Sequence, residues 1–203
     1  MVFESLLCAG DSRWGVVGVG MRSGVLVQAL RQCDGWYPVL VEGEIPTWHW
    51  VGAVTQTLMA STEYGQVTAA IAAPTTRWLT LSVTEKAYTL DLAALIVEGL
   101  TVRRDGGLPG LTIASCDNLR DNGDCLKSLC LHVASHNPAL SQWIIEHCRF
   151  PNSMVDRMVP AASATLKAKA LIDLGTHAID TAISAEPFWE WVIQDHFQDP
   201  SDA

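Results

Sequence analysis

A glycine-rich turn near the start of the chain has the residue types and spacing of a dinucleotide-binding turn. The segment WGVVGVGMRSG places Gly18-x-Gly20-x-x-x-Gly24 after an apolar run and before an expected helix. Glycines let the backbone approach a pyrophosphate, and the N-terminus of the following helix favours its negative charge. Glu42 follows about twenty positions later, where such folds bind a ribose hydroxyl. By itself, this pattern predicts a cofactor-binding turn.

A second polar loop follows the apolar run LTLSV. Thr84, Glu85 and Lys86 bring a hydroxyl, a carboxylate and an ammonium group together at the end of an expected strand. One interpretation is contact with the ribose or the nicotinamide amide of a cofactor. The alternative is a turn of solvated charges.

A third polar loop follows the run LTIAS and carries Asp117 and Asn118. An asparagine amide at a strand end suits the polarisation of a carbonyl or an alkoxide, because it donates a hydrogen bond without changing its charge. The alternative is that Asp117, Asn118 or Asp121 caps the next helix.

The segment RFPNSMVDRMVP places Asp156 and Arg157 between apolar residues. A carboxylate in this position suits the orientation of a substrate hydroxyl or of a partner group. The alternative is an internal ion pair between the two side chains.

The cysteines and histidines form no recognisable metal motif. Cys125, Cys130 and His132 have the spacing C-x4-C-x-H, which matches no common zinc pattern and falls inside an apolar helix. We expect the six cysteines to be reduced thiols, mostly buried, and we expect no metal site.

These loops must be positioned by a sheet, because apolar β-rich runs alternate with helical stretches along the chain. The expected strands are 14–19, 37–42, 48–54, 77–84 and 110–116, and the expected helices are 25–33, 63–73, 90–105, 122–135, 138–148 and 164–175. Strands without polar alternation, separated by helices, predict a parallel sheet covered on both faces. Ligands bind at the carboxyl ends of such strands, which is where the polar loops lie.

Composition restricts the class of partner. The chain has 203 residues, enough for one sizeable domain, and a formal net charge of -9. We expect no nucleic-acid or anionic-membrane partner, because both need a basic face. No apolar run approaches the roughly 18 residues that span a bilayer, and the N-terminal segment does not resemble a signal peptide. A cytoplasmic location is therefore expected.

Four segments in the same order resemble one family. They are LTLSVTEKAY, LTIASCDNLRDNG, WIIEHCRFPNSMVDRMVPAAS and EPFWEWVIQDHF. Taken together they resemble the mannitol dehydrogenase family of polyol-specific long-chain dehydrogenases, which includes mannitol 2-dehydrogenase and fructuronate reductase (D-mannonate oxidoreductase). The resemblance runs from about Trp14 to Phe197. It implies an α/β fold with a Rossmann-like, doubly wound, mostly parallel sheet, and reversible hydride transfer between a polyol or aldonate hydroxyl and NAD(P) without a metal.

The resemblance also reassigns the glycine-rich turn. WGVVGVGMRSG is similar to the family's second strand, while the family's own glycine turn, G-x-G-x-F-x-R-A-H, has no match in the sequence. The expected fold therefore lacks the family's first strand. Gly18 and Gly20 then serve close packing and the strand exit, and Glu42 loses its ribose role. Arg22 and Ser23 lie in the loop near the adenosine ribose, but the acidic residue that favours NAD in the family is missing, so both NAD and NADP remain open.

The resemblance assigns roles to the other loops. Asn118 matches a position that polarises the alkoxide or carbonyl beside the nicotinamide, and Asp156 matches a position in the same cleft. Thr84, Glu85 and Lys86 match the loop under the cofactor. The lysine general base belongs to a segment K-x-x-x-L-N-x-x-H in a second, helical domain, and this segment has no match in the sequence.

We therefore expect residues 1–203 to be a single, partial dinucleotide-binding domain, truncated at both ends and inactive alone. Weak or no NAD binding is expected because the first strand and its glycine turn, which would hold the pyrophosphate, are missing. No mannitol- or mannonate-dependent NADH formation is expected because the general base is missing. The substrate, mannitol/fructose or mannonate/fructuronate, stays open. The alternative is a non-catalytic binding or interaction protein built on the same fold, which associates with a partner or with itself through exposed apolar surface.

Overall fold

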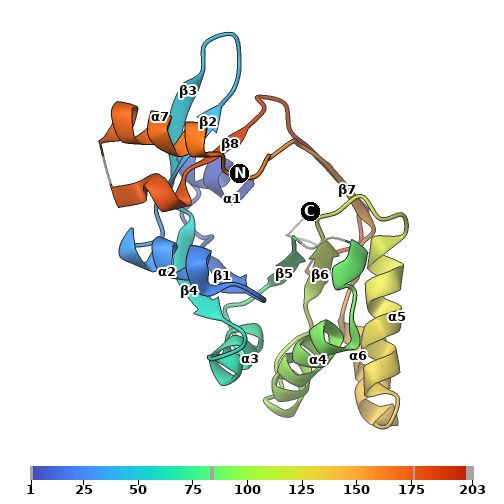
Figure 1. Ribbon diagram of the computed structural model, residues 1–203. Helices are drawn as coiled ribbons and strands as arrows, with labels where there is room; N and C mark the ends of the chain where they lie inside the picture. Colours follow the sequence, from blue (N-terminus) through green and yellow to red (C-terminus); the bar gives the residue numbers. More distant parts are fainter. Residues whose placement is uncertain (1, 83–84, 176, 200–203) are drawn as a thin grey trace. The chain divides into compact units, whose positions relative to one another are not determined.

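The computed structural model describes residues 2–82, 85–175 and 177–199 (Figure 1). The chain forms two compact units, and each unit combines two separate stretches of sequence. The first unit comprises Met1–Tyr64 and Arg157–Trp189, and the second comprises Gly65–Asp156 and Glu190–Ala203. Each unit contains its own sheets and helices.

The first unit holds two small sheets. In one, β1 (Val16–Gly20) and β4 (Val54–Met59) run parallel. In the other, β2 (Tyr37–Val41) lies between antiparallel β3 (Thr47–Val51) and parallel β8 (Ile183–Ala185). Its helical segments are α1 (Val2–Cys8), α2 (Gly24–Gln32), α7 (Ala164–Leu174) and the 3-10 helix η2 (His177–Thr181).

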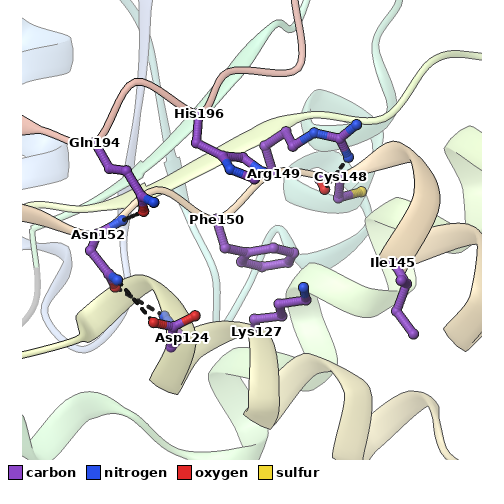
Figure 2. A pocket seen from close by; sticks show the side chains of 9 residues that line it. All are labelled: Asp124, Lys127, Ile145, Cys148, Arg149, Phe150, Asn152, Gln194 and His196. Carbon is purple, nitrogen blue, oxygen red and sulfur yellow. Dashed lines mark hydrogen bonds between the residues drawn. The ribbon is translucent and has the colours of Figure 1, made fainter.

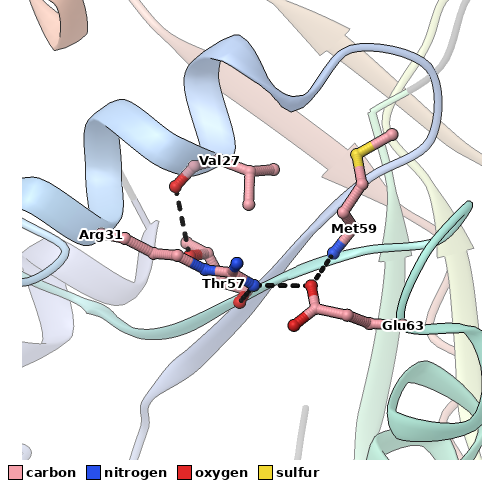
Figure 3. Close-up of polar contacts among 5 residues, drawn as sticks. All are labelled: Val27, Arg31, Thr57, Met59 and Glu63. Carbon is pink, nitrogen blue, oxygen red and sulfur yellow. Dashed lines mark hydrogen bonds and ion pairs between the residues drawn. The ribbon is translucent and has the colours of Figure 1, made fainter.

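A cluster of polar contacts holds α2 against β4 in the first unit (Figure 3). Arg31 Nη2 donates to the carbonyl oxygen of Thr57 at 2.7 Å and to Glu63 Oε2 at 2.6 Å. Glu63 Oε2 also accepts a hydrogen bond from the backbone N–H of Met59 at 2.7 Å. Thr57 Oγ1 completes the cluster by donating to the carbonyl oxygen of Val27 at 3.5 Å. These contacts fix α2, the helix that follows the loop after β1, against β4.

The second unit is built around β6 (Thr112–Ser115), whose residues are all buried. β5 (Trp78–Leu81) runs parallel to β6 on one side, and Arg149 forms a parallel bridge to Thr112. β7 (Ser153–Asp156) pairs antiparallel with β9 (Glu190–Ile193). The helical segments are α3 (Tyr64–Ala72), which starts at the boundary between the units, the 3-10 helix η1 (Glu85–Ala87), α4 (Leu90–Asp105), α5 (Asn122–Ala134) and α6 (Pro138–His147).

Helices α4, α5 and α6 pack against one another, and α4 buries a charged side chain. Arg103 is 1% exposed, and its guanidinium donates to the carbonyl oxygens of Ile71, Ala73 and Pro109. Buried cations are tolerated when hydrogen bonds replace water, and three backbone carbonyls do so here. Arg103 therefore joins the ends of α3 and α4 and has a structural role.

The expected α/β fold with a mostly parallel arrangement is confirmed. The pairs β1–β4, β2–β8 and β5–β6 are parallel, whereas β2–β3 and β7–β9 are antiparallel. The single strand expected at 48–54 is wrong, because β3 ends at Val51 and β4 begins at Val54. Gly52 lies in the break, where a Cβ atom would meet the Trp36 ring at 2.5 Å, so the chain turns under this ring.

The cysteines are less buried than expected. Only Cys130 and Cys148 are buried, while Cys8 and Cys125 are exposed. Cys125 faces solvent because it lies on the outer side of α5, away from the core residue Cys130. Among the described residues, no helix has the length and hydropathy needed to span a bilayer.

Candidate functional site

The loop after β6 presents Asn118 to solvent at the carboxyl end of a buried strand. Ser115 ends the strand, and Asn118 is exposed three residues later. Asp117 Oδ1 accepts hydrogen bonds from the backbone N–H of Leu119 at 3.2 Å and from Asn122 Nδ2 at 2.8 Å. Asp117 therefore closes the loop from inside, and Asn118 next to it is exposed.

Asp117, Asn118 and Asp121 were the three candidate caps of the next helix, and only Asp121 stands at the N-cap position of α5. Asp121 occupies the N-cap position of α5 with a left-handed backbone, φ 54°, and its side chain makes no capping hydrogen bond. Asp117 bonds inside the loop and to Asn122, and Asn118 takes no part in the cap. The polar residues of this loop are therefore not explained by the start of α5.

Asn122, at the start of α5, is fully buried, and sequence reasoning gave it no role in the site. Its Nδ2 also donates to the carbonyl oxygen of Ser153 at 2.8 Å, and its Oδ1 accepts from the backbone N–H of Ser153 at 3.0 Å. The adjacent Gly123 is tightly placed, since a Cβ there would lie 2.4 Å from the Phe150 carbonyl oxygen. The Asn-Gly pair at a helix start was the available signal for this close approach.

The loop that contains Lys86 is anchored by Tyr88 to the end of the same strand. The Tyr88 hydroxyl donates to Ser115 Oγ at 2.5 Å, and burial raises the pKa of Tyr88 above its ordinary value. Lys86 is exposed within η1, which also contains Glu85. Thr84 lies outside the described residues. The polar loops after β5 and β6 therefore meet at Ser115.

Arg22 and Ser23 are exposed in the loop between β1 and α2, in the first unit. Ser23 caps α2, because its Oγ accepts a hydrogen bond from the backbone N–H of Val25 at 3.3 Å. A Cβ at Gly20 would lie 2.6 Å from Val27 Cγ2, so glycine is required where the strand ends against the helix. The packing role expected for Gly20 is confirmed. The same role expected for Gly18 is wrong, because a Cβ there would meet its nearest neighbour, Thr57 Cγ2, at 3.7 Å, an ordinary contact.

Asp156 is exposed at the end of β7, where it pairs with Glu190 of β9. In the part of the chain that the structure describes, no ion pair joins Asp156 to Arg157. Arg157 Nη2 instead donates to the carbonyl oxygen of Glu186 at 3.0 Å. The ion-pair alternative is therefore wrong.

A cavity of about 340 Å³ lies beside α5 in the second unit (Figure 2). It is lined by Asp124, Lys127, Ile145, Cys148, Arg149, Phe150, Asn152, Gln194 and His196. Within it, Asn152 Nδ2 donates to Asp124 Oδ2 at 2.9 Å, and Gln194 Oε1 accepts from the Asn152 backbone N–H at 3.2 Å. None of the residues expected in the site lines this cavity. Among the described residues, no three or more His, Cys, Asp or Glu gather where they could hold a metal ion.

Comparison with known proteins places the chain in one family. Residues 3–202 match the family described as mannitol dehydrogenase Rossmann domain. D-mannonate oxidoreductase of Escherichia coli (strain K12) is 34% identical, with 95% of this chain and 46% of that protein covered. Mannitol 2-dehydrogenase of Aspergillus terreus is 30% identical, with 94% of this chain and 44% of that protein covered.

Solved structures agree with this assignment. A substrate-free D-sorbitol dehydrogenase has a TM-score of 0.88, and the ternary complex of Pseudomonas fluorescens mannitol 2-dehydrogenase with NAD and D-mannitol has a TM-score of 0.87. Each is 27% identical, with 98% of this chain and 47% of that chain covered. The chain spans about half the length of the relatives it matches. It belongs to the mannitol dehydrogenase family, and it corresponds to the family's Rossmann domain.

Proposed function

We propose that these 203 residues supply the cofactor-binding part of an NAD(P)-dependent oxidoreductase that acts on a polyol or an aldonate. The observation that carries the proposal is the exposed Asn118 at the carboxyl end of the buried strand β6, with Asp117 held behind it. Family membership supports it and makes a non-catalytic interaction protein the less favoured alternative. The relatives named D-mannonate oxidoreductase and mannitol 2-dehydrogenase suggest mannonate/fructuronate and mannitol/fructose as the substrate pairs to test.

The residues present fit a dinucleotide. In the first unit, Arg22 is exposed on the loop after β1 and offers a cation for a phosphate. In the second unit, Lys86 and Asn118 are exposed on loops after β5 and β6 and offer a cation and an amide for ribose and carbonyl oxygens. The bound nicotinamide would supply the hydride acceptor.

Two side chains would act on the substrate. The Asn118 amide would donate a hydrogen bond to the reacting oxygen and stabilise the charge that develops there. The Asp156 carboxylate would accept a hydrogen bond from a substrate hydroxyl and fix its orientation. Arg22 would neutralise a phosphate near the adenosine ribose, which leaves both NAD and NADP as cofactors to be tested. The sequence contains no K-x-x-x-L-N-x-x-H segment to supply the general base.

The proposal separates binding from turnover. The 203-residue chain is expected to bind NADH weakly but saturably, and to form no NADH from NAD with mannitol, mannonate or related polyols. Absorbance at the NADH band during incubation with a panel of polyols and aldonates measures the second part. Steady turnover by the purified chain would show that it contains a general base and would overturn that part.

Replacing Asn118 tests the site itself. Asn118→Ala removes one hydrogen-bond donor, so the Kd for NADH is expected to rise about fivefold to tenfold, equivalent to about 1 kcal/mol. The matched control is Asn137→Ala in the same unit, where the Asn137 side chain caps α6 by accepting from the Leu140 N–H at 3.1 Å. This variant is expected to lose stability and keep the wild-type Kd. An unchanged Kd in Asn118→Ala would contradict the assignment of Asn118.

A further inference from the structure

We propose that Asn122 is the positioning residue of this site, holding the loop that carries Asn118 and the strand that carries Asp156 in one fixed arrangement. This inference rests on the proposed function, because Asn118 and Asp156 are the ligand-binding residues that Asn122 would hold in position. Asn122 itself is fully buried and therefore touches neither cofactor nor substrate.

The side chain of Asn122 forms hydrogen bonds with two segments, the loop after β6 and strand β7. Asn122 Nδ2 donates to Asp117 Oδ1 at 2.8 Å, and Asp117 immediately precedes Asn118. The same amide bonds Ser153 twice, through Nδ2 to its carbonyl oxygen at 2.8 Å and through Oδ1 from its backbone N–H at 3.0 Å. Ser153 is the first residue of β7, whose last residue is Asp156. Since both segments are fixed by one rigid amide, they cannot shift independently.

The Asp117 carboxylate has few hydrogen bonds besides the one that Asn122 Nδ2 donates to it. Its Oδ2 is buried without a hydrogen-bond partner, and its Oδ1 is held by the Leu119 N–H and by Asn122. Loss of Asn122 would remove one of the donors that hold the Asp117 carboxylate and leave it the Leu119 N–H and the neighbouring Tyr88 hydroxyl, so the carboxylate would turn toward water if the backbone allows it. Asn118 would then be moved with it.

Ser153 and Ser115 connect these two segments to the polar loop after β5. Ser153 Oγ donates to the carbonyl oxygen of Ser115, and Ser115 Oγ accepts from Tyr88 at 2.5 Å. Tyr88 follows the η1 segment that contains Lys86. The loops singled out after β5 and β6, and strand β7, are therefore tied together within the second unit.

The start of α5 does not by itself call for asparagine at this position. The N-cap residue of α5 is Asp121, so Asn122 lies one residue inside the helix, where the side chain is not needed for capping. Its polar atoms are directed instead to Asp117 and Ser153. A second link joins Asn152, just before β7, to Asp124 of α5, and it is exposed (Figure 2).

A double-mutant cycle on NADH affinity tests the inference. Asn122→Ala, Asn118→Ala and the double variant are titrated with NADH after circular dichroism shows that each is folded. Asn122→Ala is expected to raise the Kd at least as much as Asn118→Ala, and the double variant is expected to bind no more weakly than Asn122→Ala. Additive effects, or an unchanged Kd in Asn122→Ala, would overturn the positioning role. Asn137→Ala is the control for a stability loss elsewhere in the same unit.

A second measurement does not require the cofactor. Amide hydrogen exchange at Leu119 and Ser153 is expected to be about tenfold faster in Asn122→Ala than in the wild type, with α6 amides unchanged. Equal exchange at Leu119 and Ser153 would contradict the inference even if NADH binding were lost. If the wild type binds no NADH, the proposed function fails while this measurement still decides whether Asn122 positions the loop. Should Asn122→Ala not fold, Asn122→Asp replaces it, because it keeps the volume and the acceptor for the Ser153 N–H.

Discussion

The residues around β6 fall into two groups: exposed side chains that could contact a ligand, and buried side chains that hold the surrounding segments in place. Asn118 and Asp156 are exposed, while Asn122 is fully buried and Ser115 is buried at the end of the strand. The exposed pair was predictable from sequence, because polar residues that follow apolar strands are conspicuous. Asn122 was not, since a buried amide that bonds to residues far along the chain leaves no local pattern.

Gly123 is the residue whose substitution should be most damaging for steric reasons. In Gly123→Ala, the new Cβ would lie 2.4 Å from the carbonyl oxygen of Phe150 and 2.6 Å from that of Pro151. Because both obstacles are backbone atoms, we expect a loss of about 1–3 kcal/mol or more in the free energy of unfolding, measured by urea titration. Gly65→Ala is the control, since a Cβ there meets nothing within 4 Å, and its stability should equal or exceed that of the wild type. Equal losses in both variants would contradict the steric account.

At the scale of elements, local patterns predicted the helices better than the strand pairings. The helix expected at 90–105 is α4 itself, and the predicted breaks before Pro138 and after Asp105 are present. The short strands β7, β8 and β9 were not foreseen, because their pairing depends on segments distant in sequence. The 48–54 run failed because Gly52 under Trp36 interrupts an otherwise continuous β-like pattern.

The contact between α2 and β4 should depend on pH through Glu63. Its hydrogen bonds with Arg31 and with the Met59 N–H lower the pKa of Glu63 below its ordinary value of 4.5. The folded state therefore binds this proton more weakly than the unfolded state, so the stabilisation is complete above the ordinary pKa and is lost as pH falls through the folded pKa. Glu63→Gln is expected to unfold more readily than the wild type near neutral pH, and the difference should shrink as the pH falls below the ordinary value of 4.5. A difference that is constant with pH would mean that the charge of Glu63 contributes nothing.

At the scale of the whole molecule, the two compact units distribute the candidate site residues unevenly. Arg22 and Ser23 belong to the first unit, whereas Lys86, Asn118 and Asp156 belong to the second. Long motifs such as SCDNLRDNG indicated the family, because a motif that covers a whole loop is more specific than a repeating pattern of apolar residues. Self-association through exposed apolar residues stays a prediction.

Thiol reactivity should report the folding of the second unit, which contains both buried cysteines. Burial raises the pKa of Cys130 to about 12 and that of Cys116 and Cys148 to about 11, so these thiols stay protonated near neutral pH. Since the thiolate is the reactive form, iodoacetamide should modify the exposed Cys8 and Cys125 first. Peptide mapping by mass spectrometry is expected to find Cys130 and Cys148 modified only after denaturation. Early modification of either buried cysteine in native protein would contradict the packing of α5 and α6.

The most direct test of the account is a titration of the wild-type 203-residue chain with NADH, in which tryptophan fluorescence reports binding. NAD and NADP are then added to displace the bound NADH. Saturable binding that NAD or NADP displaces is predicted, with the Kd raised in Asn118→Ala. A linear response without saturation up to the solubility limit of NADH would contradict the central claim that this chain is a cofactor-binding domain.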